Sequence, residues 1–315
     1  MLRLVNLSNY ADALKMVEGS NDFLQTFLRE HQLDGLEMIF SETWDEKLPQ
    51  KDLIYGAHLW FWNDWLDFWY GDIASLVKNY GSEEKIVSWF GGLKKENWLE
   101  LYRNNIIVSQ KAAVKYLVFH VSNARISEIF NRQYHFSDKE VIDATIELVN
   151  ILSKDISPDV ELLFENLWWP GLTLLDKQLV AYLLANVKHP NCGIMLDTGH
   201  LLNTCPTLES EEEGIDYLLN KIENLGEYKK YIKGIHLNCS LSGQYVKEKL
   251  AKTSIEPTMQ EVFEHVQKID QHLPFTNPRI KEVVHLVKPK YLVHEFITKD
   301  MAVWSQRIKK QQNLI

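Results

Sequence analysis

Short apolar runs in this chain repeatedly end in side chains that can bind metal ions. Six runs end in such a residue, namely His58 in GAH, His120 in VFHVS, Glu165 in LLFEN, Asp197 in GIMLDTGH, His236 in GIHLN and Glu295 in LVHEF. His200 follows three residues after Asp197, and Asp270 and His272 form a D-x-H pair. Imidazole and carboxylate groups are the ligands of zinc, manganese and iron. Because burying so many ionisable groups together is costly without a cation, the pattern predicts a divalent-metal site.

Each of these residues also has an ordinary structural interpretation. A single histidine at a strand end is often only hydrogen-bonded, and Glu165 or Asp197 could cap the helix that follows. Asp270 could be a turn residue before Pro274. In LVHEF, neighbouring side chains point to opposite faces of a strand, so we expect Glu295 to point inward and His294 to face the helices. The metal prediction therefore depends on the joint pattern.

The elements that would position these groups alternate between apolar runs and amphipathic stretches. We expect eight strands, at Leu2–Leu7, Gly35–Phe40, Ile54–Phe61, Val114–Val121, Val160–Leu167, Gly193–Asp197, Ile232–Asn238 and Tyr291–Phe296. Helical patterns cover Asn21–His31, Lys94–Ala112, Asp138–Ser153, Asp176–Val187, Glu209–Leu225, Thr258–Ile269, Pro278–Val287 and Asp300–Gln311. Such alternation is typical of a parallel sheet covered by helices. Eight units in about 300 residues favour a closed (β/α)8 barrel of the α/β class. No linker divides the chain, so we expect residues 1–315 to form one domain.

Two connections are longer than the usual ~2–6 residues of α/β units. The first, at about 60–93, contains LWFWNDWLDFWYGD, and the second, at about 239–257, contains SGQYVKEKLAKTSIEP. In a barrel both would lie on the catalytic face, where they could shape a substrate pocket. Aromatic rings there could stack on a base, a sugar or a larger ring, or could pack the loop onto the barrel. The candidate substrate-binding residues are Trp60, Trp62, Trp168, Trp169 and Asn238.

The composition limits the class of protein. An apolar content of 45% and a charged content of 24% are typical of a globular protein with a sizeable core. A formal charge of −9 argues against a general nucleic-acid-coating surface. No run approaches the ~20 apolar residues of a membrane span, and the N-terminal run does not resemble a secretory signal. The three cysteines contain no CxxC pair, which disfavours a disulfide framework or a thiolate zinc site. We therefore expect a cytoplasmic enzyme or binding protein.

Several motifs together resemble a known superfamily. They are FHVS around His120, ENLWWPGLTL from Glu165, LDTGH, HLNCS around His236, the Asp270-Gln271-His272 triplet and the final HEF. The sequence resembles the xylose isomerase-like TIM-barrel superfamily over nearly its whole length, and within it the endonuclease IV (AP endonuclease family 2) branch. The resemblance implies a divalent metal held by Glu165, Asp197, His236 and Glu295, hereafter the central set.

The endonuclease IV branch implies two further ligand sets. His58 and His120 with Glu165 would hold another ion and are called the first set, while His200, Asp270 and His272 form the outer set. The resemblance thus implies up to three ions per chain, with zinc expected and manganese or iron as alternatives. The sequence has no evident counterpart of the basic loops that insert into DNA in this branch. We therefore expect a small or cofactor-like phosphodiester as substrate, in preference to abasic DNA.

The leading functional hypothesis is metal-dependent hydrolysis of a phosphodiester. Four carboxylates against three divalent ions would leave a net charge of about +2, which favours an anionic substrate. A metal-bound water would attack phosphorus in line. The two candidate catalytic residues are Glu165, which would bridge ions, and Glu295, which would orient the water.

Two alternatives remain open. In a sugar isomerase or epimerase with one metal ion, Glu165 and Glu295 would serve as base and acid, and His58 and His120 would contact sugar hydroxyls. A non-catalytic sugar or metal binder is the other alternative. Metal stoichiometry and turnover separate the three hypotheses.

Overall fold

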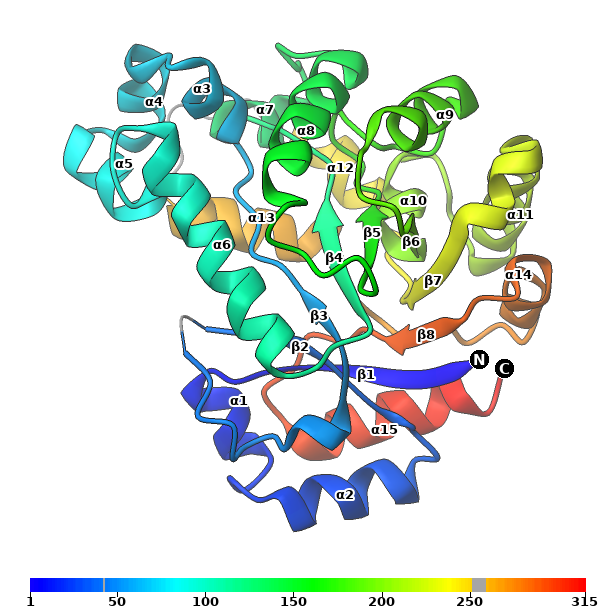
Figure 1. The fold of residues 1–315 in the computed structure, drawn as a ribbon. Coiled ribbons are helices and arrows are strands. Elements are labelled where there is room, and N and C mark those ends of the chain that lie inside the picture. The colour runs from blue at the N-terminus through cyan, green and yellow to red at the C-terminus, as the bar shows by residue number, and fades with distance from the viewer. Residues whose placement is uncertain (42, 251–258) are drawn as a thin grey trace.

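Eight parallel strands form a closed barrel and follow one another in sequence order (Figure 1). The computed structural model describes residues 1–41, 43–250 and 259–315. The strands are β1 Leu2–Ser8, β2 Gly35–Ile39, β3 Ile54–His58, β4 Tyr116–His120, β5 Glu161–Glu165, β6 Cys192–Asp197, β7 Ile232–Leu237 and β8 Tyr291–His294. Pairing of β1 with β8, with Leu2 opposite Tyr291, closes the barrel. The predicted (β/α)8 fold is confirmed.

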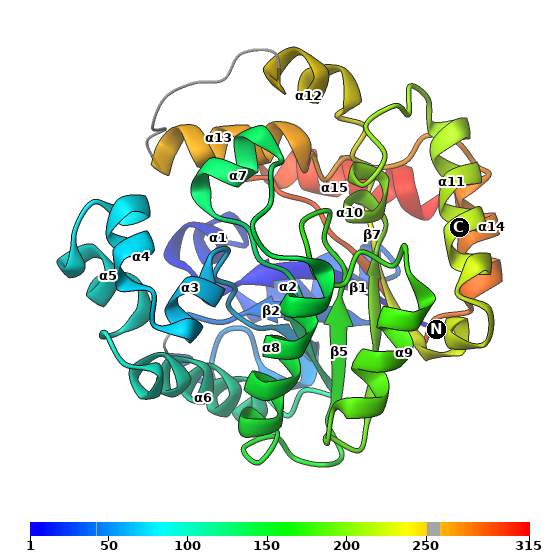
Figure 2. The ribbon, with the colours of Figure 1, turned by 90° about the horizontal axis from the view of Figure 1, so that it is seen from above.

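Helices surround the strands on all sides (Figure 2). They are α1 Ala11–Met16, α2 Asn21–Glu30, α3 Trp65–Tyr70, α4 Ile73–Tyr80, α5 Glu83–Phe90, α6 Lys95–Lys111, α7 Ile126–Asn131, α8 Asp138–Leu152, α9 Lys177–Asn186, α10 Thr198–Asn203, α11 Glu211–Asn224, α12 Gly243–Leu250, α13 Met259–Ile269, α14 Ile280–Val287 and α15 Met301–Gln312, with short 3-10 turns at Lys51–Leu53 and Gly226–Tyr231. Capping boxes begin α8, where Ser137 pairs with Glu140, and α11, where Ser210 pairs with Glu213. No helix of the described residues is long and apolar enough to cross a membrane.

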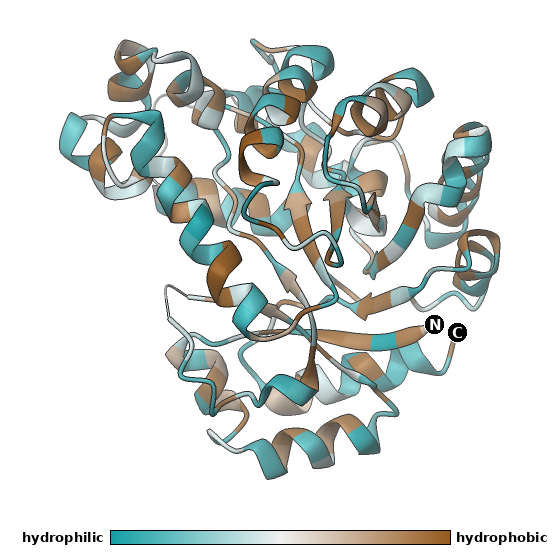
Figure 3. Ribbon diagram, viewed as in Figure 1, coloured by the Kyte–Doolittle hydropathy of each residue, from teal (hydrophilic) through white to brown (hydrophobic). Residues whose placement is uncertain are grey.

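The inside of the barrel is apolar below the candidate site. The strands are mostly hydrophobic along their length (Figure 3). Inward-facing side chains fill the barrel; they are Leu4, Tyr116, Val118, Leu163, Met195, Tyr291 and Val293. Because parallel strands share one register, their carboxyl ends meet at one rim. The register places His120 beside Glu165 and Asp197 beside His236.

The first long connection, predicted at about 60–93, contains the three short helices α3, α4 and α5. Most of its aromatic side chains are buried around Trp98 of α6, with Trp62, Trp65, Phe68, Trp69 and Phe90 in ring contact with that indole. These rings pack the connection onto the barrel, which was one of the two predicted interpretations.

The second long connection, predicted at about 239–257, includes α12, and its residues 251–257 lie outside the described residues. Helices α7, α12 and α13 gather over one side of the barrel mouth (Figure 2). Side chains from these helices, including Ile129, Val246 and Val262, form an apolar cluster with Trp168 and Trp169. This cluster covers the rim next to Glu165.

Candidate metal centre

The nine predicted ligands lie together at the carboxyl-terminal rim of the barrel. Their ligand atoms fall into four groups, each with all its atoms within 4.8 Å of one another. The groups are His58, Glu165 and His236; His120, Glu165 and His200; His200, Asp270 and His272; and Glu165, Asp197, His236 and Glu295. The last two coincide with the outer and central sets, whereas the residues of the predicted first set are divided between the other two groups, which share Glu165. The structure thus brings together side chains from β3 to β8 that are far apart in the sequence.

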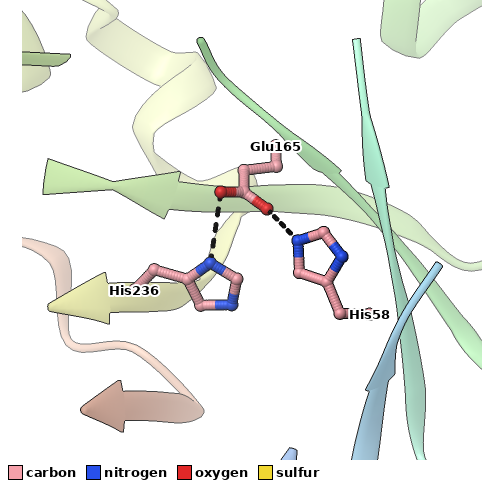
Figure 4. Close-up of side chains that lie close together, drawn as sticks. All are labelled: His58, Glu165 and His236. Atoms are coloured by element: carbon pink, nitrogen blue, oxygen red, sulfur yellow. Dashed lines mark hydrogen bonds and ion pairs between the residues drawn. The ribbon is translucent and has the colours of Figure 1, made fainter. Parts of the chain in front are cut away.

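Glu165, at the end of β5, is the centre of this cluster (Figure 4). Its Oε2 lies 2.9 Å from His58 Nε2 and 3.2 Å from His120 Nε2, so both histidines of the first set face the same oxygen. Its Oε1 lies 3.2 Å from His236 Nδ1, on the side of the central set. The carboxylate is fully buried. This is the arrangement expected of a carboxylate that bridges two cations.

Asp197 ends β6, and polar neighbours fix both of its oxygens. Its Oδ1 accepts the backbone N–H of His200 at 2.6 Å, so the residue does cap α10. Its Oδ2 accepts the side-chain amide of Asn238 at 2.7 Å. Asn238 therefore positions a candidate ligand, a role different from the predicted substrate contact. A Cβ at Gly199 would overlap the Asn238 side chain, which explains the glycine of DTGH.

The outer set closes through a turn held by Ser240. Asp270 Oδ2 lies 3.2 Å from His200 Nε2 and 2.7 Å from His272 Nε2. Ser240 Oγ accepts the backbone N–H of Gln271 at 2.9 Å and that of His272 at 3.3 Å. Two backbone hydrogen bonds between Cys239 and Leu273 tie the same turn to the end of β7. These hydrogen bonds bring Asp270 close to the end of β7, although it is far from His236 in the sequence.

Four of the five histidines donate a proton from one ring nitrogen to a backbone carbonyl or to Glu37. Three donate from Nδ1 to backbone carbonyls, namely His58 to Leu59 at 3.0 Å, His200 to Asn166 at 2.8 Å and His272 to Glu295 at 3.2 Å. His236 donates from Nε2 to Glu37 Oε2 at 3.1 Å, and Oε1 of the same carboxylate lies 2.9 Å from that nitrogen. Because a carbonyl or carboxylate oxygen accepts, each of these nitrogens carries hydrogen, and the other nitrogen can face a metal ion. Metal-binding histidines are oriented in this way.

Glu37 in β2 is a functional residue that the sequence interpretation missed. It is fully buried and accepts hydrogen bonds from His236 and, at 2.7 Å, from the Tyr116 hydroxyl. Burial alone would raise the pKa of Glu37, but the facing His236 outweighs it and holds the pKa below its ordinary value. The available signal was a glutamate inside the apolar run GLEMIF.

Burial and the facing charges shift the pKa values of several side chains in the cluster. Burial raises the pKa of Glu295 to about 7, although His236 and His272 act in the opposite direction. Burial lowers the pKa of His120 to about 4, while for His272 the Asp270 and Glu295 carboxylates outweigh burial and raise the pKa to about 10.

Three buried atoms of the central set lack a hydrogen-bond partner among the described residues: Glu165 Oε1, His236 Nδ1 and Glu295 Oε2. Unpaired buried polar atoms are costly, and a shared cation would satisfy all three. The residues present therefore fit a divalent metal.

The predicted aromatic substrate residues lie next to the cluster. Trp168 is buried, with its ring centroid 5.2 Å from that of His200, and Trp169 packs beside it. Trp60 and Trp62 line a cavity of about 620 Å³ together with His58 and His120.

The chain matches the xylose isomerase-like TIM barrel family over residues 26–285 and belongs to that family. It is similar to a D-psicose 3-epimerase solved in the presence of D-fructose (11% identity, 100% of this chain and 96% of that one, TM-score 0.54). It is also similar to the 3-keto-D-glucoside 4-epimerase of E. coli (9% identity, 100% of both chains, TM-score 0.52). A D-tagatose 3-epimerase-like protein is a third match (16% identity, 99% and 97% of the chains, TM-score 0.50). No curated protein sequence matches the chain. At these identities the structural matches show the fold alone.

Proposed function

We propose that this protein is a metal-dependent hydrolase that cleaves a small or cofactor-like phosphodiester. The observation that carries this proposal is the convergence of nine candidate ligands, among which four histidines donate a proton from one ring nitrogen to a backbone carbonyl or to Glu37. A centre for one ion needs only the central set. The first and outer sets add five further ligands, which supports a centre for up to three ions, with zinc preferred by this histidine-rich donor set.

Divalent ions held by these sets would supply Lewis acidity and lower the pKa of a bound water. The protein's own residues would do the rest. Glu165, with an oxygen facing each of two sets, would keep the sets at a fixed separation. Glu295 Oε2, which lacks a hydrogen-bond partner among the described residues, would orient the attacking water and accept its proton. Trp168, buried against His200, would keep bulk water from this side of the centre.

A second candidate is a single-metal sugar isomerase or epimerase. The solved structures described above are sugar epimerases or an epimerase-like protein, and they fit this alternative better than phosphodiester hydrolysis. The central set alone would hold one ion, and Glu165 Oε1 and Glu295 Oε2 both lie close to His236 Nδ1, at 3.2 and 3.3 Å. They would then act as base and acid on a sugar. The remaining histidines would contact hydroxyl groups.

The deciding experiment combines metal counting with two activity assays on the same purified protein. Metal content is measured by plasma mass spectrometry, hydrolysis with bis(p-nitrophenyl) phosphate, and epimerisation with D-fructose. Our proposal expects two to three ions per chain, up to about three at saturation. It also expects Asp197→Asn to abolish hydrolysis.

Two histidine variants sharpen the comparison. His272→Ala removes a ligand of the outer set, whereas His285→Ala removes an exposed imidazole of α14 and serves as the control. The proposal expects His272→Ala to lose about one ion and most of the hydrolysis, and His285→Ala to lose neither. One ion per chain together with D-fructose epimerisation would instead establish the second candidate. Metal binding without turnover of either substrate would indicate a binding protein.

A further inference from the structure

A preformed cavity lies directly beside the first set. Its volume of about 620 Å³ falls within the ~300–1,000 Å³ usual for small-molecule sites. Its walls come from the connection after β1, the end of β2, the connection after β3, and helices α5 and α6. The lining residues are Tyr10, Ile39, His58, Leu59, Trp60, Phe61, Trp62, Ser88, Trp89, Gly91, Leu101 and His120. His58 and His120 connect the cavity to the candidate metal centre.

Hydrogen bonds to the backbone hold the tryptophans of this wall in place. Trp60 Nε1 donates to the carbonyl of Phe40 at 2.6 Å, and Trp62 Nε1 donates to the carbonyl of Trp89 at 2.8 Å. Their polar groups are thus already paired, and the rings offer only apolar surface to a ligand. Phe61 packs its ring against the His120 imidazole, with centroids 4.7 Å apart. The cavity is therefore built before any ligand arrives, which reduces the entropy cost of binding.

The lining has little capacity to bind a polyol. Apart from His58, His120 and the indole N–H of Trp89, the polar side chains of its described lining are Tyr10 and Ser88, and no lysine, arginine, aspartate or glutamate lines it. A sugar placed against this wall would leave hydroxyl groups without partners, which costs free energy. An aromatic or other apolar ring system would lose only its unfavourable contact with water.

We propose that this cavity binds an apolar, ring-containing substituent of the substrate while the phosphate lies at the metal centre. The substrate class is then a phosphodiester in which one ester group is bulky and apolar. This inference rests on the proposed function. It adds specificity residues, among them Trp89 and Leu101. These two residues line the cavity, are not candidate metal ligands, and would determine which substrates bind.

The test is a ligand series measured by calorimetry on the metal-loaded protein. Methyl, butyl, phenyl and 2-naphthyl phosphate share one phosphate and differ in apolar bulk, and 2-naphthol supplies the ring alone. We expect affinity to rise by on the order of a hundredfold from methyl to 2-naphthyl phosphate. A flat series in a protein that still hydrolyses bis(p-nitrophenyl) phosphate would overturn this inference and leave the proposed function intact.

Variants of the wall make the test specific. Trp89→Ala removes a half-exposed indole while keeping the backbone carbonyl that accepts from Trp62, and it should reduce the ratio of 2-naphthyl to methyl affinity by about tenfold. Leu101→Asn, which puts a polar group of similar size into the wall, should reduce the same ratio. Val87→Ala on the exposed face of α5 is the matched control and should leave the ratio unchanged. An unchanged ratio in both wall variants refutes the inference. A different result would refute the proposed function instead. In that result 2-naphthol binds as tightly as 2-naphthyl phosphate, so that phosphate adds nothing to the affinity, and Trp89→Ala still weakens 2-naphthol binding.

Discussion

Replacement of Glu37 by glutamine tests whether the centre binds metal in the way its hydrogen bonds indicate. Glu37 is not one of the candidate ligands; it accepts hydrogen bonds from His236, which is one, and from Tyr116. Its carboxylate accepts the His236 Nε2 proton through Oε2, at 3.1 Å. That bond directs Nδ1 toward Glu165 and Glu295. Glutamine keeps the size and one accepting oxygen but loses the negative charge.

The size of the effect follows from the bond that changes. A charge-assisted hydrogen bond contributes about 1.5–3 kcal/mol, against about 1 kcal/mol for a neutral one. Without the extra strength of the charge-assisted bond, the His236 imidazole becomes a poorer metal ligand. Substitutions of carboxylates that support a metal-binding histidine in this way typically reduce metal affinity by about 10–100-fold. We therefore expect the ion of the central set to bind about 10–100-fold more weakly in Glu37→Gln.

The assay is a zinc titration against a fluorescent competing chelator, with metal content measured after dialysis. Tyr116→Phe is one control, because it removes only the hydroxyl partner of Glu37 and should have a smaller effect. Glu161→Gln is the other control. It neutralises a buried carboxylate at the start of β5 that pairs with Lys233 and Lys290, and it should leave zinc affinity unchanged. Unchanged affinity in Glu37→Gln would refute the supporting role. Loss of every ion together with a lowered melting temperature would indicate a folding defect instead.

Three further predictions concern the turn, the metal and a buried acid. Gly199→Ala should lower hydrolysis by about tenfold or more without lowering the melting temperature strongly, because its Cβ displaces Asn238 from Asp197 while alanine suits helix α10. Removal of metal with a chelator should abolish hydrolysis and lower the melting temperature, and added zinc should restore both, since ligands that bind only the folded state stabilise it. Asp64 is fully buried, and burial raises its pKa from 3.8 to about 7. The folded protein then binds this proton more tightly than the unfolded chain, so its contribution to stability falls as pH rises from about 4 to 7. Asp64→Asn should remove this pH-dependent loss in the free energy of unfolding, which amounts to at most ~4 kcal/mol. Melting curves of both proteins across this pH range would detect the difference.

The strands and the clustering of the candidate ligands could be predicted from the sequence because both depend on local pattern. Apolar runs such as Gly193–Asp197 are visible in the sequence, and a polar residue at the end of a parallel strand lies at a defined rim. Gln311 of α15 lies 3.0 Å from His294 Nδ1, so His294 does face the helices as alternation predicted. The expected helix at Lys94–Ala112 likewise differs from α6 by one residue at each end.

The supporting residues could not be predicted because they depend on contacts between distant strands. Asn166 pairs with the backbone of Asp197 at 2.9 and 3.0 Å across the rim, and Ser240 holds a turn thirty residues further along the chain. Neither pairing leaves a periodic signal. The helices α3 to α5 were also missed, because each has only six to eight residues and their burial comes from packing on Trp98. Short helices of this kind are stabilised by tertiary contacts more than by propensity.

The position of the candidate centre also indicates why the barrel tolerates so polar a rim. The centre lies directly above an apolar interior in which Tyr116 and Tyr291 are in ring contact, so its carboxylates are not solvated from below. Covering aromatic residues such as Trp168 limit solvation from one side. Without a cation, protonated histidines would have to supply the positive charge that offsets burial of the Glu165 and Glu295 carboxylates. His120 could not contribute near neutral pH, because burial lowers its pKa to about 4. An ion held by Glu165 of β5 and Glu295 after β8 would offset the free-energy cost of burying these carboxylates. It would also link two strands that lie in different parts of the barrel. Metal binding and closure of the barrel should for this reason be coupled, and the melting temperature should depend on free zinc concentration.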